Sequence, residues 1–245
     1  MTAPRSPDFR PHPHLTVRVE HRGREREPAV VIDDFLAEPQ ALVDVAAAGG
    51  RFAPVRGNLY PGIRAPLPAA YLRVLVGCLQ EPVRKVFGLS DVDLARVEGD
   101  FSIVTTPPQQ LQLLQCLPHF DTTDGRQVAV LHYLCAPALG GTSFYRHRSS
   151  GYETIDVTRH DGFMAALGAE LKQSGPPARY YMQGSNAIFE RIGALTAAFN
   201  RLVIYRSATL HSGDIPADFR FDPNPRTGRL TANTFLRFRS AARTG

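Results

Sequence analysis

His119 and Asp121 are separated by one residue, in the stretch Pro118-His119-Phe120-Asp121. Successive side chains on an extended strand point to opposite faces, so an imidazole and a carboxylate at this spacing share a face. They are two of the three ligand types of a 2-His-1-carboxylate triad, which leaves coordination positions open on a non-haem Fe(II). Because a lone His-x-Asp is common in proteins, the rest of the chain must supply the third ligand.

His211 is the candidate third ligand, since it follows the apolar strand predicted at 202–205 and precedes Ser212-Gly213. That position follows the end of a predicted strand. His132 is the competitor, but no second ligand type lies near it at metal spacing, and we interpret it as a core or supporting histidine. His147 and His160 lie beside arginines, and cationic neighbours disfavour a metal there.

Further motifs follow in a fixed order along the chain. They are Leu131-His132-Tyr133-Leu134, Gly140-Gly141-Thr142-Ser143-Phe144, His211-Ser212-Gly213 and Arg229-Leu230-Thr231. With His119 and Asp121 at their head, residues 98–238 resemble the Fe(II)/2-oxoglutarate-dependent dioxygenases, and most closely their prolyl-4-hydroxylase-like branch. The ordered set is far more specific than any one of its pieces.

The resemblance implies a mainly β fold with flanking helices around a double-stranded β-helix, the jelly roll also found in cupins. It implies an enzyme that uses Fe(II), 2-oxoglutarate and O2 to hydroxylate a substrate. The metal ligands would be His119, Asp121 and His211. In this family an arginine beyond the distal histidine binds the far carboxylate of 2-oxoglutarate, and a planar guanidinium suits that role because it pairs with a carboxylate through two hydrogen bonds.

Arg229 matches that arginine, and Thr231 lies two residues on, so both side chains share a face of the strand predicted at 229–238. Tyr133 is a further candidate to hydrogen-bond the same carboxylate. Arg220, in the polar loop after His211, and Arg237, farther along the strand, are the rival anchors. The gap between His211 and Arg229 is longer than is usual in the family.

The substrate, an amino acid, a peptide or a small metabolite, is not identified by the sequence. Arg64, Arg146 and Arg148 would suit an anionic or peptide ligand. The first of them belongs to a turn-rich loop at 58–66, which also carries Tyr60 and is predicted either to meet the substrate or to pack on the surface.

The composition is that of a globular protein. The 245 residues include 43% hydrophobic and 21% charged residues, and we predict a single domain over 1–245. Three cysteines without a Cys-x-x-Cys pair favour a reducing, cytoplasmic location. No signal peptide or transmembrane span is expected. The net charge of +5 comes from dispersed arginines, which makes nucleic-acid binding an unfavoured hypothesis. The oligomeric state is left open.

The elements follow from periodicity and from turn residues. Residues 1–14 are predicted to be frayed, and Pro82 to kink or divide a helix. A helical insert at 149–200 is predicted to act either as a lid or as an outer buttress. Strands are predicted at 15–20, 29–32, 101–105, 110–114, 128–134, 202–205 and 229–238, and helices at 41–48, 68–87, 161–172 and 186–199.

Two other function classes compete with the oxygenase hypothesis. One is a non-catalytic jelly roll that binds a metal, a sugar or a peptide without turnover. The other is a cupin-type isomerase or hydrolase that uses His119 and His211 with water on Zn or Mn. A pure binding protein would not need Arg229 behind the metal. Release of succinate in the presence of Fe(II), ascorbate and 2-oxoglutarate would separate all three.

Overall fold

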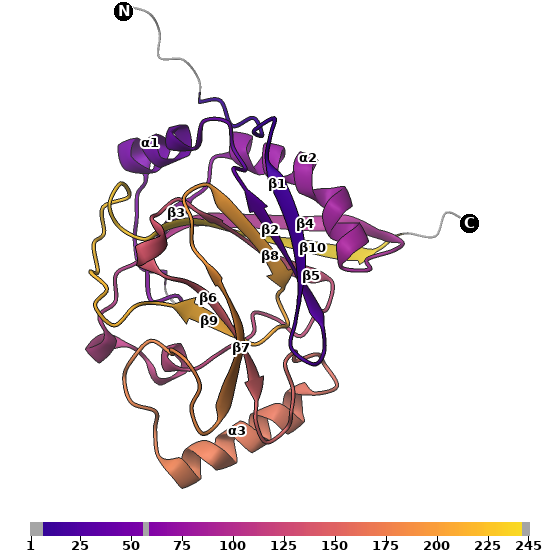
Figure 1. Ribbon diagram of the computed structural model, residues 1–245, viewed down its shortest axis with the longest axis vertical. Helices are drawn as coiled ribbons and strands as arrows, with labels where there is room; N and C mark the ends of the chain where they lie inside the picture. Colours follow the sequence, from indigo (N-terminus) through magenta and orange to yellow (C-terminus); the bar gives the residue numbers. More distant parts are fainter. Residues whose placement is uncertain (1–6, 56–58, 242–245) are drawn as a thin grey trace, which may run out of the picture.

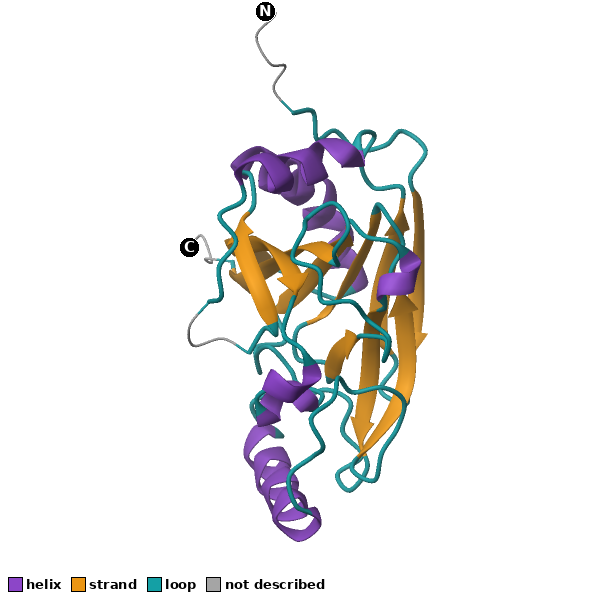
Figure 2. Ribbon diagram, turned by 90° about the vertical axis from the view of Figure 1, so that its left-hand side faces the viewer, coloured by secondary structure: helices purple, strands orange, loops and turns teal. Residues whose placement is uncertain are grey.

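Two antiparallel sheets form the body of the protein in the computed structural model, which describes residues 7–55 and 59–241 (Figures 1 and 2). The larger sheet has the strand order β1-β2-β8-β5-β10-β4-β3, and the smaller has the order β7-β6-β9. The strands are β1 (Thr16–Arg22), β2 (Glu27–Asp33), β3 (Gly62–Pro66), β4 (Val92–Val104), β5 (Gln127–Tyr133), β6 (Gly141–His147), β7 (Phe189–Thr196), β8 (Arg201–Arg206), β9 (His211–Asp214) and β10 (Leu230–Ser240).

The chain passes back and forth between the two sheets. From β4 in the large sheet it runs to the segment at His119, which joins β9 by an isolated bridge to His211. It returns through β5, enters the small sheet at β6 and β7, returns through β8, and then adds β9 to the small sheet and β10 to the large one. The four strands β8, β5, β10 and β4 of the large sheet face β7, β6, β9 and the segment at His119, and this connection makes a double-stranded β-helix. The fold prediction is therefore confirmed.

Both faces of the large sheet are covered at β5 and β8, which explains why these two central strands are apolar almost throughout. Val130 and Ile204 face outward and pack with α1 (Pro39–Gly49) and α2 (Ala69–Val86). Ala129 and Tyr205 face inward, in the cluster that joins the small sheet. The helices α1 and α2 lie at one end of the molecule and α3 (His160–Ser174) at the other (Figures 1 and 2).

Several element predictions are confirmed and others are wrong. The segment 186–199 was predicted as a helix but holds β7, and 110–114 was predicted as a strand but holds parts of two 3-10 helices, Pro108–Gln110 and Leu113–Cys116. Helix α2 runs through Pro82 without being divided.

The N-terminal prediction needs a correction over its described part, since residues 1–6 lie outside the described residues. Phe9 is buried against Tyr71, and Pro11 forms a bridge to Leu36. Residues 7–14 are therefore packed against the fold rather than frayed. Within the described ranges, no helix has the length and the apolar character that a membrane crossing needs.

Candidate active site

His119, Asp121 and His211 come together at the edge of the small sheet. One ligand atom from each lies within 4.8 Å of the other two. The Nε2 atoms of His119 and His211 each lie 3.8 Å from Oδ1 of Asp121. The backbone produces this arrangement, because His119 and His211 exchange two N–H to carbonyl hydrogen bonds of 2.8 Å, and the Asp121 N–H donates to the carbonyl of Ser207 at 2.8 Å.

The protonation states suit a divalent metal. Desolvation by the surrounding protein, joined for His119 by the neighbouring His211, lowers the pKa of His119 and of His211 to about 4, so both imidazoles are neutral near pH 7. Nδ1 of His211 donates to the carbonyl of Thr209 at 2.9 Å, which leaves the lone pair of Nε2 directed at the cluster. Burial raises the pKa of Asp121, while the neighbouring His119, a hydrogen bond with Ser207 and the charge of Arg64 lower it.

The cluster fits the donor set of a 2-His-1-carboxylate site, with two neutral nitrogens and one carboxylate converging from two segments. His132 takes no part in it. That side chain is fully buried, with Nδ1 3.1 Å from the hydroxyl of Tyr71 and Nε2 3.1 Å from Oδ1 of Asn200. Its place in the core agrees with the sequence interpretation.

The three residues open into a cavity of about 490 Å³ between the two sheets. Although the His119 side chain is 46% exposed, it faces this cavity. The polar residues on the opposite wall come from strands of the large sheet and from the segments that flank them. They include Tyr60, Arg64, Gln127, Tyr205, Arg229 and Asn233.

Arg229 lies just before β10 and is buried, with 4% of its surface exposed. Nε donates to the carbonyl of Leu139 at 3.1 Å, and Nη2 donates to the carbonyl of Gly141 at 2.7 Å. The guanidinium lies 5.7 Å from the centre of the Tyr133 ring. Across the described ranges, no carboxylate forms an ion pair with it. Its remaining N–H groups are therefore available for an anion in the cavity.

Tyr133 and Thr231 lie behind the cavity wall rather than on it. The hydroxyl of Tyr133 bonds that of Thr142 at 2.7 Å, and it is Thr142 that lines the cavity. Thr231 is buried, with its hydroxyl 3.3 Å from the carbonyl of Ser102. The predicted contact of Tyr133 and Thr231 with the 2-oxoglutarate carboxylate stays a prediction, and in this structure Tyr133 supports Thr142 of the cavity wall.

The sequence matches one family model, described as "Family of unknown function (DUF6445)", over residues 13–236. The chain belongs to this family. No curated protein matches the sequence.

The DUF6445 chain also resembles solved structures at low identity. The epimerase SnoN from nogalamycin biosynthesis is 14% identical with a TM-score of 0.47, covering 86% of this chain and 78% of that one. The carbocyclase SnoK from the same biosynthesis is 15% identical with a TM-score of 0.48, covering 90% and 85%. HygX from Streptomyces hygroscopicus, solved with nickel, 2-oxoglutarate and hygromycin B, is 15% identical with a TM-score of 0.44, covering 85% and 82%. At these values the likeness carries no conclusion about chemistry.

The other arginines considered from the sequence of this DUF6445 protein lie elsewhere. Arg220 is exposed, and Arg237 pairs with Asp124 at 3.5 Å outside the described cavity lining. Arg146 donates to the carboxylates of Glu153 and Glu190, and Arg148 donates to the carbonyl of Asn186. Of the three arginines suggested for a ligand, only Arg64 lines the cavity.

The predicted helical insert at 149–200 contains one helix, α3, an irregular segment at 175–188 and the strand β7. Helix α3 packs Phe163 and Leu167 against the small sheet, as a buttress would. The segment 175–188 that follows reaches the cavity, where Tyr181 and Met182 line it. The hydroxyl of Tyr181 donates to the carbonyl of Thr106 at 2.6 Å, so this segment covers one side of the cavity.

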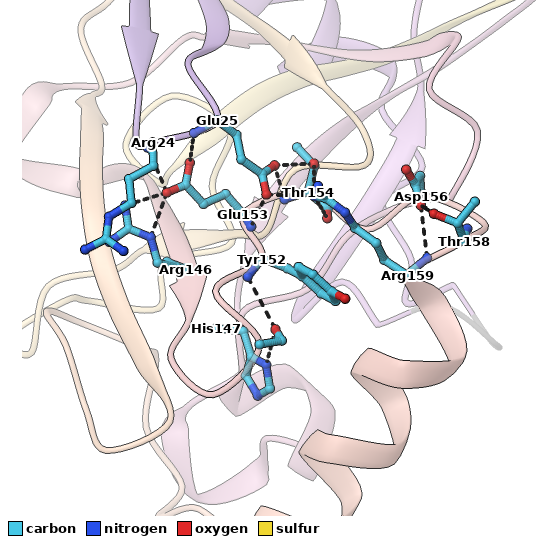
Figure 3. A network of polar contacts seen from close by, with 11 residues as sticks. Arg24, Glu25, Arg146, His147, Tyr152, Glu153, Thr154, Asp156, Thr158 and Arg159 are labelled. Carbon is cyan, nitrogen blue, oxygen red and sulfur yellow. Dashed lines mark hydrogen bonds and ion pairs between the residues drawn. The ribbon is translucent and has the colours of Figure 1, made fainter.

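A buried polar network supports the segment that precedes His211 (Figure 3). The carboxylate of Glu153 accepts the backbone N–H groups of Arg24 and Glu25 at the β1–β2 turn, and Nε of Arg146 at 2.8 Å. The carbonyl of Glu153 then accepts the N–H of Leu210 at 2.8 Å. The network thus ties the large sheet to the backbone of the distal histidine.

Sequence reasoning did not select Thr142, Tyr205 or Tyr181 as site residues. Thr142 was visible in the stretch Gly140-Gly141-Thr142-Ser143-Phe144, and its place on the wall follows from the turn that begins β6. The parity of β8 puts Tyr205 on the inner face, and this signal was present in the sequence. Tyr181 belongs to an irregular segment, whose path no periodicity predicts.

Proposed function

We propose that this protein is an Fe(II)- and 2-oxoglutarate-dependent oxygenase that hydroxylates a small-molecule or peptide substrate with O2. One observation carries the proposal: a 2-His-1-carboxylate cluster and a buried guanidinium without a carboxylate partner in the described chain line the same cavity. The order of the motifs supports the prolyl-4-hydroxylase-like branch of that superfamily.

His119, Asp121 and His211 would hold the iron, with both imidazoles bound as neutral ligands. When bound, iron and 2-oxoglutarate together supply the activation of O2 and the oxidation of the substrate. The hydrogen bond from His211 to Thr209 fixes the ring and its tautomer, as supporting contacts do in other metal sites.

Arg229 would bind the far carboxylate of 2-oxoglutarate. A buried cation without a partner is costly, and an anionic ligand relieves that cost. The two bonds to the carbonyls of Leu139 and Gly141 hold the guanidinium plane in place before the ligand arrives. Thr142, held by the hydroxyl of Tyr133, offers a further hydrogen bond beside it. The segment 175–188 would limit the access of water from one side.

The decisive experiment measures succinate formed from 2-oxoglutarate under Fe(II), ascorbate and O2, with and without a panel of candidate substrates. Succinate that requires His211 and Arg229 is the expected result. Ligand binding without succinate would favour a non-catalytic jelly roll, and a metal-dependent hydrolysis or isomerisation without consumption of 2-oxoglutarate would favour the cupin-type alternative. We also infer a reducing, cytoplasmic location, because Cys78, Cys116 and Cys135 are free thiols.

A further inference from the structure

The cavity holds a second cation that the proposed function does not use. Arg64 lies on β3 and lines the same cavity as Arg229. On the inner face of the large sheet, Arg64 lies opposite Ser102 of the neighbouring strand β4. Asn233, also in the cavity lining, lies on β10 opposite Asp100.

The guanidinium of Arg64 is held without a strong acidic partner. It stacks over the ring of Tyr60 at 4.6 Å, and its side chain is 19% exposed. Its closest carboxylate is Asp100, with Nη1 3.8 Å from Oδ2, which exceeds hydrogen-bond distance. Nε of Arg64 and Oδ1 of Asn233 are buried and have no hydrogen-bond partner among the described residues. This set of polar atoms is therefore open to a ligand.

The charges of the cavity indicate what that ligand carries. Arg64 and Arg229 are the two guanidinium groups in the cavity lining, and Arg229 is assigned to 2-oxoglutarate. Glu98 also lines the cavity, but it is exposed and pairs with Arg96 at 2.5 Å. Asp100, with its side chain 41% exposed, offsets only part of the Arg64 charge from 3.8 Å, so Arg64 favours a ligand with one negative charge. Low-dielectric sites strongly favour such pairing.

We propose that the substrate is a small organic acid whose carboxylate binds to Arg64 on the face of Tyr60, with Asn233 beside it. This inference rests on the proposed function, because Arg229 is already assigned to 2-oxoglutarate. A planar guanidinium is suited to a carboxylate, which it pairs through two parallel hydrogen bonds. The cavity of about 490 Å³ is in the size range of small-molecule sites.

The test uses ligand-observed NMR on the full chain loaded with Zn(II) and 2-oxoglutarate, so that no turnover occurs. The probes are small carboxylic acids, each paired with its primary amide and with a phosphate monoester of similar size. We expect at least one acid to bind, and its amide to bind about ten-fold more weakly or worse. Arg64→Gln should abolish this preference, and Arg64→Lys should restore part of it.

Arg239→Gln is the matched control, since Arg239 is an exposed arginine on β10 outside the cavity lining, and it should keep the full preference for the acid. Arg239→Gln should also keep the affinity of the wild type for 2-oxoglutarate. The proposal is overturned if no acid is preferred over its amide, if phosphates are preferred, or if the preference survives Arg64→Gln. A wild-type protein that binds no 2-oxoglutarate would instead overturn the proposed function.

Discussion

At the scale of single residues, the three residues of the cluster and the core residue His132 lead to opposite expectations for metal binding. Asp121→Ala removes the charged ligand of the cluster. Because even supporting partners of metal ligands contribute about 10–100-fold to affinity, loss of Asp121 itself should weaken metal binding by more than about 100-fold. His132→Ala should leave metal binding intact and lower the free energy of unfolding by about 1–3 kcal/mol, since it leaves the buried polar groups of Tyr71 and Asn200 without their partner.

Isothermal titration with Zn(II) and denaturant unfolding of each variant measure the two effects. His211→Ala should behave as Asp121→Ala does. A protein that loses its metal with His132→Ala and keeps it with His211→Ala would show that the ligands are assigned wrongly.

Arg229 leads to a second residue-scale prediction. Removing the cation from a buried carboxylate costs about 3–5 kcal/mol. Arg229→Ala should therefore raise the apparent constant for 2-oxoglutarate by roughly 100- to 5,000-fold, while affinity for the metal barely changes. Arg229→Lys should recover part of the loss, because lysine keeps the charge but cannot form the two-bonded pair.

Arg220→Ala and Arg237→Ala are the controls for Arg229, since both residues lie outside the described cavity lining. Both should retain the affinity of the wild type for 2-oxoglutarate. The anchor lies elsewhere if either control loses that affinity while Arg229→Ala keeps it.

The sequence predicted the residues that could do chemistry better than it predicted their surroundings. The assignment of His119, Asp121 and His211 as ligands stays a prediction, which the structure supports by bringing them within 4.8 Å. The place of Thr142 on the wall and of Tyr133 behind it depends on how the small sheet meets the large one. The alternation of side chains along a strand predicts which face of its own sheet a residue occupies, but not how that sheet packs against the other.

At the scale of elements, Glu153 connects the β1–β2 turn to β6 and to the segment before His211. It is 1% exposed, and its carboxylate pairs with Arg146 at 2.5 Å. Glu153→Gln should lower the free energy of unfolding by about 3–5 kcal/mol, because one partner of a buried ion pair is lost. It should also weaken metal binding, because a weaker hold on residue 153 would shift its backbone carbonyl, which accepts the N–H of Leu210 beside His211.

Glu190→Gln is the matched control for Glu153, because Glu190 also pairs with Arg146 but its side chain is 39% exposed. Exposed pairs contribute little, so this variant should lose less than about 1 kcal/mol of unfolding free energy and keep its metal affinity. Equal losses in both variants, measured by urea unfolding, would contradict a supporting role specific to Glu153.

Element predictions failed where tertiary context outweighs local pattern. The segment Phe189–Thr196 has an apolar spacing that was read as helical, yet it pairs with β6 along its length as β7. Such pairing depends on a partner more than forty positions away, which a local window does not include. By contrast, β5 and β8 were predicted because strands buried on both faces read as continuous apolar runs.

At the scale of the whole molecule, stability should decrease in acid because buried histidines must become charged. His132 is fully buried, and burial lowers its pKa from 6.5 to about 4. The side-chain amide of Asn200 is fixed by two hydrogen bonds with the backbone of Leu36, so its Oδ1 faces His132 as an acceptor. Nε2 of His132 therefore donates to Oδ1 of Asn200, and Nδ1 of the neutral ring accepts from the hydroxyl of Tyr71. The core therefore holds the neutral ring, and protonation at Nδ1 would lose the hydrogen bond from Tyr71.

The sign of the pH dependence follows from which state binds more protons. Between pH 6.5 and about 4, the unfolded chain protonates this histidine and the folded chain does not, so the stabilisation is complete above pH 6.5 and is lost as pH falls toward 4. A shift of this size corresponds to about 3 kcal/mol.

In metal-free protein, His132→Gln should reduce the acid-induced decrease in the free energy of unfolding between pH 6.5 and 4 by about that amount. His21→Gln, at an exposed position on β1, should run parallel to the wild type, and a His132→Gln curve that also runs parallel would contradict the neutral buried ring.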